Sequence, residues 1–92
     1  MKSNFSELKL RQLDAALNRW RSADLPPRPA SGWVKAVRES LGMAAAHLAA
    51  RLGVTTSTVT RLETSEAEDT ISLGTLRRAA EALGCELHYV LV

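Results

Sequence analysis

The strongest constraint on this chain is a turn at Gly53, which separates an alanine-rich segment from a threonine-rich one. Glycine adopts the left-handed backbone conformation that a sharp turn between two helices requires. Ala49 is small enough to let those helices cross closely, and Val59 can fill the angle between them. The spacing predicts two short helices, over about 44–52 and 56–64, with the N-terminal end of the second projecting.

A proline-rich segment separates a leading helix from this central pair. Prolines occupy positions 26, 27 and 29, and proline cannot continue a helix. We therefore expect a helix that ends near Ala23, followed by a stiff linker over 24–30. Apolar residues recur in the leading helix at spacings of three, four and three, which is typical of an amphipathic helix. These residues are Leu10, Leu13, Leu17 and Trp20.

Two further helices are expected, one on each side of the central pair. Ser31 can cap the earlier one, which stops at Gly42. Ser72 can cap the later one, which stops at Gly84. The acidic stretch 65–70 is expected to be a loop.

Residues 85–92 have a different pattern from the helices. Alternate positions are apolar, and β-branched and aromatic types gather there, which favours a short β-strand. No second strand pattern occurs in the sequence. The backbone groups of this strand must therefore be met by another copy of the protein, by a partner chain or by solvent.

Charge is distributed unevenly along the chain. The net charge is +2, but residues 1–62 hold ten lysines and arginines against four acids, whereas residues 63–92 hold two arginines against six acids. Such a division can present a basic face to a polyanion such as DNA. It is equally compatible with two ordinary solvated surfaces, so charge alone leaves the partner open.

Composition excludes several classes of protein. The 92 residues fit one compact domain, and the single cysteine, Cys85, cannot form a disulfide within the chain. His47 and His88 lack metal-ligand spacing and have no paired nucleophile or carboxylate, so we expect no enzymatic activity, metal or cofactor. No apolar run is long enough to span a membrane and the first ten residues do not form a secretory signal, so a cytoplasmic location is expected.

The region from about 33 to 83 resembles the helix-turn-helix of the phage repressor and Cro family, the Xre-like regulators. The matching features are Ala49, Gly53 and Val59 together with Leu41-Gly42-Met43, Arg61-Leu62-Glu63 and Ala82-Leu83-Gly84. The resemblance implies an all-α, lambda-repressor-like helix-turn-helix bundle, here with an extra N-terminal helix and a short C-terminal β-strand. It also implies that Arg38 and Glu63 bridge two helices of the domain.

The same resemblance implies which residues bind DNA. The base-reading positions fall on Thr56, Ser57, Thr60 and Arg61, and Thr55 stands at the start of the same helix. Short hydroxyls can bond phosphates or base edges, and arginine can bind the O6 and N7 atoms of a guanine. We therefore expect these residues to form the DNA-reading surface.

The sequence departs from the family pattern at Ala44 and Ala45. Family members often carry a hydroxyl cap and a glutamine there, and both help to hold the DNA backbone. We keep Ala45 among the DNA-binding positions, although its side chain lacks the expected phosphate contact. Three basic residues are candidate substitutes for that contact, namely Arg28, Lys35 and Arg51.

Nearly the whole chain looks like one subgroup of these regulators, usually called mobile mystery protein A. The matches are Arg11-Gln12-Leu13-Asp14, the prolines before Gly32-Trp33, Ile71-Ser72-Leu73-Gly74-Thr75-Leu76, and Ala82-Leu83-Gly84-Cys85-Glu86-Leu87 followed by Tyr89. Members of this subgroup are encoded beside a Fic-domain protein. The resemblance therefore implies a Fic-type partner and a toxin–antitoxin pairing.

A second resemblance concerns the C-terminal strand. HipB-like antitoxins also have a strand after the last helix, and two copies pair their strands across a symmetry axis. This resemblance implies a homodimer formed through Glu86, Leu87, His88, Tyr89, Val90 and Leu91. The alternative is a frayed tail.

These patterns divide the chain into an N-terminal helix and proline linker (1–30), a helix-turn-helix DNA-binding domain (31–84) and a dimerisation strand (85–92). The first hypothesis is a transcriptional repressor that binds a palindromic operator in double-stranded DNA as a homodimer, because one recognition helix reads too few bases for useful specificity. It would autoregulate an operon that includes the Fic-type toxin. The alternative is a protein-binding antitoxin whose leading helix and acidic loop bind a partner, with weak or no DNA binding.

Overall fold

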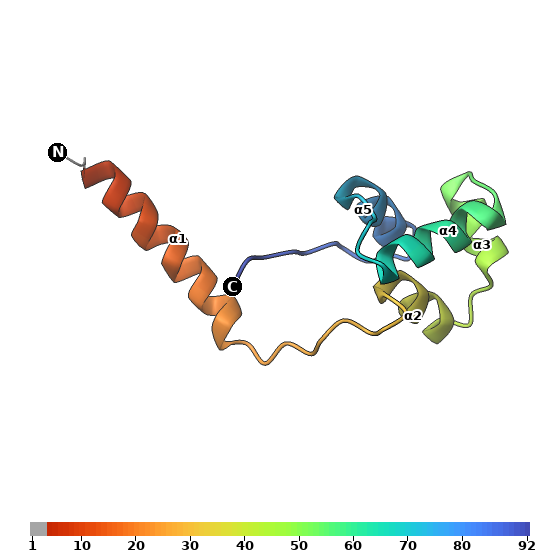
Figure 1. Ribbon diagram of the computed structural model, residues 1–92, viewed down its shortest axis with the longest axis horizontal. Coiled ribbons are helices and arrows are strands. Elements are labelled where there is room, and N and C mark those ends of the chain that lie inside the picture. Colours follow the sequence, from red (N-terminus) through yellow and green to blue (C-terminus); the bar gives the residue numbers. More distant parts are fainter. Residues whose placement is uncertain (1–3) are drawn as a thin grey trace. The chain divides into compact units, whose positions relative to one another are not determined.

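The computed structural model describes residues 4–92, with Asn4 described by its backbone alone, and contains five α-helices and no β-strand in that range (Figure 1). Residues 1–3 of the predicted N-terminal region lie outside the described part of the chain. The helices are α1 (Asn4–Ser22), α2 (Trp33–Ser40), α3 (Ala45–Leu52), α4 (Thr56–Ala67) and α5 (Leu73–Ala82).

The chain forms two compact units. The first contains α1, the residues up to Pro26 and the C-terminal segment His88–Val92, and the second spans Pro27–Leu87. The second unit contains α2 to α5 and has its own apolar core, whereas most large apolar side chains of α1 are exposed.

The core of the second unit forms where α3, α4 and α5 meet. Leu48 and Val59 are fully enclosed, and Ala79 is small enough to let α5 approach them closely. Burying a leucine or valine side chain of this kind stabilises the fold by roughly 1.5–3 kcal/mol. The complete core is Val34, Met43, Leu48, Ala49, Val59, Leu62, Ala79 and Leu83.

The turn between α3 and α4 follows from its local sequence. Gly53 adopts a left-handed conformation with φ 69°, and the Val54 backbone N–H donates to the Ala49 carbonyl oxygen at 3.0 Å. This bond satisfies an acceptor that the end of α3 would otherwise leave free. The buried side chain of Ala49 then allows α4 to cross close to α3.

Two predicted helix boundaries were wrong. The helix α4 ends at Ala67 rather than near residue 64, so the predicted loop over 65–70 is partly helical. The N-cap of α2 is Gly32 rather than Ser31, and the Gly32 backbone has φ 90°. Both errors have one tertiary cause, because Glu66 in the last turn of α4 binds the first turn of α2.

The predicted C-terminal β-strand was also wrong. No residue of 85–92 has strand structure, and the Cys85 backbone N–H instead donates to the Ala80 carbonyl oxygen at 2.8 Å, which closes the end of α5. A strand exists only when a neighbouring strand accepts and donates its backbone hydrogen bonds. The described chain offers no such neighbour, so the alternating pattern alone did not produce a strand.

Candidate nucleic-acid interface

The N-terminal end of α4 is capped by Thr55. Its side-chain oxygen accepts a hydrogen bond from the Thr58 backbone N–H at 3.2 Å, and it also lies 3.1 Å from the Ser57 hydroxyl. This arrangement satisfies one of the N–H groups that have no acceptor within the helix. The N–H groups of Thr56 and Ser57 stay available to an anion such as a DNA phosphate.

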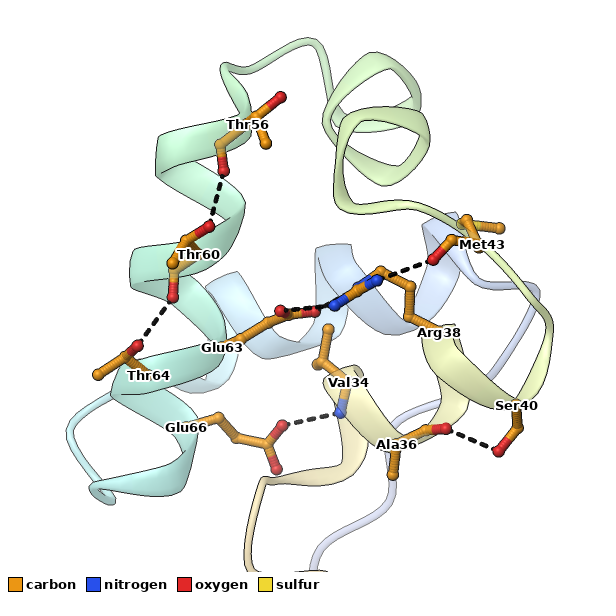
Figure 2. A network of polar contacts seen from close by, with 10 residues as sticks. All are labelled: Val34, Ala36, Arg38, Ser40, Met43, Thr56, Thr60, Glu63, Thr64 and Glu66. Carbon is orange, nitrogen blue, oxygen red and sulfur yellow. Dashed lines mark hydrogen bonds and ion pairs between the residues drawn. The ribbon is translucent and has the colours of Figure 1, made fainter.

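The exposed face of α4 carries a line of hydroxyl groups. The Thr60 hydroxyl donates to the Thr56 carbonyl oxygen at 3.3 Å, and the Thr64 hydroxyl donates to the Thr60 carbonyl oxygen at 3.0 Å (Figure 2). Each bond uses the single hydroxyl proton and leaves the oxygen lone pairs free to accept. This face can therefore accept hydrogen bonds from the amino groups of base edges.

Arg61 adds a positive charge to the same helix. It is exposed and has no ion-pair or hydrogen-bond partner among residues 4–92. A free guanidinium on an exposed helix face can bind the O6 and N7 atoms of a guanine with two parallel hydrogen bonds. The structure thus presents Thr56, Ser57, Thr60 and Arg61 to solvent on one helix.

The start of α3 has no side-chain cap. Ala44 has the extended backbone of an N-cap residue but no oxygen to accept a hydrogen bond, and Ala45 is half-buried against the core. At this position the chain can therefore offer DNA only backbone N–H groups of the first turn.

The ion pair between Arg38 and Glu63 joins α2 to α4 (Figure 2). Arg38 donates from Nε to Glu63 Oε2 at 2.7 Å, from Nη2 to Glu63 Oε1 at 3.1 Å, and from Nη1 to the Met43 carbonyl oxygen at 2.8 Å. The side chains are only 11% and 8% exposed, so water weakens the pair little. The hydrogen bond to Glu63 raises the pKa of Arg38 above its ordinary value.

Glu66 forms a second connection between α4 and α2, which the sequence analysis missed. It is 2% exposed, and its carboxylate accepts a hydrogen bond from the Trp33 backbone N–H at 2.7 Å. It accepts another from the Val34 backbone N–H at 2.9 Å (Figure 2). A carboxylate at this position satisfies free N–H groups and interacts favourably with the positive end of the helix dipole. One signal was present, because Glu66 follows Val59 by seven residues and Leu62 by four, which places it on the buried face of α4.

Arg28 binds the C-terminal end of α4, in the same turn that carries Glu66. Its guanidinium donates to the carbonyl oxygens of Glu66 and Ala67 at the end of α4, and it lies 2.9 Å from an Asp69 carboxylate oxygen. Cations stabilise helix C-termini because the last carbonyl groups have no N–H partner. Arg28 therefore holds the end of α4, a role different from the phosphate contact considered above.

Arg51 is occupied in a similar way. Its Nη1 atom donates to the Ala82 carbonyl oxygen at the end of α5, at 2.9 Å. Of the three candidate substitutes for the missing phosphate contact, Arg28 and Arg51 therefore already bind helix C-termini, whereas Lys35 is half-buried on α2.

The four helices of the second unit, α2 to α5, and the exposed polar face of α4 define a DNA-binding domain of the helix-turn-helix class. A family model described as Helix-turn-helix matches residues 34–90, which is more than half of the chain. The chain belongs to this family, in its Xre/Cro-CI type, whose members are DNA-binding transcription regulators. Neither the comparison with curated proteins nor the comparison with solved structures gives a match.

Two further observations concern other classes of site. No helix within residues 4–92 is long and apolar enough to cross a membrane. The described part of the chain also contains no group of three or more histidine, cysteine, aspartate or glutamate side chains arranged to hold a metal ion.

Proposed function

We propose that this protein is a sequence-specific transcriptional repressor that binds a two-fold operator as a homodimer. The observation that carries the proposal is the exposed polar face of α4, which is anchored by the buried carboxylates of Glu63 and Glu66. A rigidly held helix is what base reading requires, because hydrogen bonds to base edges depend on position. A dimer is proposed because one such helix contacts only a few base pairs.

The test is a gel shift with the DNA upstream of the protein's own gene. Arg61→Ala should weaken specific binding by about 1–3 kcal/mol, which is roughly 5- to 150-fold, through loss of the contact to a guanine. Circular dichroism should stay unchanged, because Arg61 is exposed and has no hydrogen-bond or ion-pair partner among residues 4–92. If this variant bound the operator as tightly as the wild type, the assignment of α4 as the recognition helix would be wrong.

Arg77→Ala is the matched control. Arg77 is an exposed arginine on α5, so its removal changes the net charge equally without touching α4. It should leave discrimination between operator and random DNA intact. Both variants should show binding that weakens steeply with salt, because bound protein releases counterions from the phosphates.

We include a Fic-type partner in the proposal because the chain resembles the mobile mystery protein A subgroup. The same resemblance, with the exposed apolar face of α1, supports a second function of another class, a protein-binding antitoxin with weak or no DNA binding. The two functions predict different results for the wild type. A repressor shifts the DNA upstream of its gene in the gel without any partner. A protein-binding antitoxin copurifies with the co-encoded protein and leaves that DNA unshifted.

A further inference from the structure

The helix α1 has an apolar face that the described chain leaves largely uncovered. Leu10 is 68% exposed, Leu13 is 57% exposed and Trp20 is 37% exposed. Trp20 lies against His88 of the same unit, with the two ring centres 6.3 Å apart. Helices in proteins gain most of their stability from the packing of an amphipathic face, so a surface that covers this face would stabilise α1.

The spacing of this face is that of a coiled coil. Leu10 and Leu17 are seven residues apart, and so are Leu13 and Trp20. Along the chain, these four residues follow one another at intervals of three, four and three. These are the a and d positions of a heptad, which pack against the same positions of another helix. Leu8 is also exposed, but it lies outside this a and d pattern.

Charged residues beside the face indicate what covers it. Glu7, Asp14 and Arg21 follow one another at intervals of seven, so they form one flank of the apolar face. Arg21 binds Asp14 of its own helix at 3.2 Å, whereas Glu7 has no ion-pair partner among residues 4–92. The first turn of α1 is thus acidic on this flank and the last turn is basic.

We infer that α1 pairs in antiparallel orientation with α1 of a second copy of this chain. In this register Leu10 lies against the partner's Trp20 and Leu13 against the partner's Leu17. The same register places Glu7 beside the partner's Arg21 at each end. It also brings Asp14 near the partner's Asp14 at the centre, where Arg21 of the same helix, 3.2 Å away, offsets the charge of each Asp14. This inference assigns the dimer contact of the proposed repressor to α1. It rests on the proposed function, which requires a homodimer.

A parallel pair is less favourable on electrostatic grounds. It would place the basic last turns of the two helices side by side, and like charges at this distance repel. It would also bring Lys9 near the partner's Asp14, but it would place no cation of residues 4–92 beside Glu7, which the antiparallel register pairs with the partner's Arg21.

The pairing is short, since 19 residues make fewer than three heptads, and we therefore expect a weak dimer in solution. Two operator half-sites hold two copies close together and raise their effective concentration. The α1 contact then makes binding to paired half-sites cooperative.

The first test measures sedimentation of the full chain over a concentration series that reaches millimolar. The wild type should dimerise, and Leu13→Glu should raise the dissociation constant of the dimer at least about tenfold by placing charge in the apolar contact. Leu8→Glu is the matched control, with the same substitution on an exposed leucine of the same helix, and it should dimerise like the wild type. A monomeric wild type, or a Leu13→Glu chain that still dimerises normally, would overturn the inference.

The second test uses charge and does not depend on the helicity of one variant. Glu7→Arg and Arg21→Glu should each weaken self-association, because each places like charges opposite one another in the antiparallel register. Mixing the two variants should restore the dimer as a heterodimer, because arginine then faces glutamate at both ends. Absence of heterodimer, in a mixture whose parent variants are both monomeric, would exclude this register.

A DNA experiment separates failure of this inference from failure of the proposed function. Leu13→Glu should bind a single half-site like the wild type and lose cooperativity on paired half-sites. Arg61→Ala should weaken binding to both duplexes. If Leu13→Glu keeps its cooperativity, the α1 contact is wrong while the repressor proposal stands. If the wild type binds neither duplex and α1 is instead covered by another protein, both are wrong.

Discussion

Glu66 caps helix α2 from the last turn of α4, with its Oε1 atom 2.9 Å from the Val34 backbone nitrogen, although the two residues are 32 positions apart in the chain. The contact is buried, and it comes with a second hydrogen bond from the Trp33 N–H to the other carboxylate oxygen. One side chain thereby determines both where α2 begins and how the end of α4 lies against it.

We expect Glu66→Ala to lower the free energy of unfolding by about 2–4 kcal/mol. The substitution leaves the buried N–H of Val34 and the partly buried N–H of Trp33 without an acceptor, and a buried group of this kind costs roughly 1–3 kcal/mol. Glu66→Gln should cost less, because its amide oxygen still accepts one bond. Urea denaturation measures both, with Glu68→Gln, an exposed neighbour in the C-cap of α4, as the control that should change little.

Gly32→Ala should be destabilising for two separate reasons. Gly32 has φ 90°, and a methyl group there would lie 2.7 Å from Glu66 Oε1. Gly42→Ala isolates the first reason, because Gly42 has φ 66° and nothing lies within 4 Å of the added carbon. We expect about 1 kcal/mol for Gly42→Ala and about 2–4 kcal/mol for Gly32→Ala in thermal denaturation. Equal losses for the two variants would show that Glu66 does not restrict position 32.

Arg38→Met should lower stability by about 3–5 kcal/mol, because it leaves the carboxylate of Glu63 buried without its cation. The double variant Arg38→Met, Glu63→Met should be more stable than this single one, because both charges are then removed together. Two denaturation curves compare them directly. A double variant as unstable as the single would show that packing, and not the unpaired charge, causes the loss.

The Arg38 contribution should not depend on pH in the neutral to alkaline range. The pKa of Arg38 is raised by its hydrogen bond to Glu63, so its stabilisation is complete below the ordinary arginine pKa and is lost only as pH rises through the higher folded-state value. The stability difference between the wild type and Arg38→Met should therefore be equal at about pH 7 and about pH 10. A difference that shrinks over this range would contradict the raised pKa.

The N-caps of α4 and α5 allow an effect on stability to be distinguished from an effect on DNA binding. Thr55 caps α4 and Ser72 caps α5 through similar bonds of 3.2 and 3.1 Å. Replacing either residue by alanine should cost about 0.5–2 kcal/mol of stability. Thr55→Ala should also weaken operator binding in a gel shift, because it loosens the first turn of α4, whereas Ser72→Ala should bind DNA normally.

Some residues of the candidate site could be predicted from the sequence, and others could not. The turn at Gly53 with Ala49 and Val59 could be predicted, because a left-handed residue and a period of 3.6 are properties of neighbouring residues. The exposed positions Thr56 and Arg61 followed from that turn through the family resemblance, which also named the pair Arg38 and Glu63. Arg28 could not be assigned, because its partners are carbonyl groups of α4 that lie 38 and 39 positions away.

The helices of the second unit and the sharp turn that presents α4 could be predicted, because they depend on local backbone preferences and on apolar spacing. The N-cap of α2 at Gly32 and the extension of α4 to Ala67 could not, since both depend on a carboxylate brought across the fold. The same holds for residues 85–92. Their alternation favours a strand, but a strand requires hydrogen-bond partners on a neighbouring strand, and the described chain supplies none.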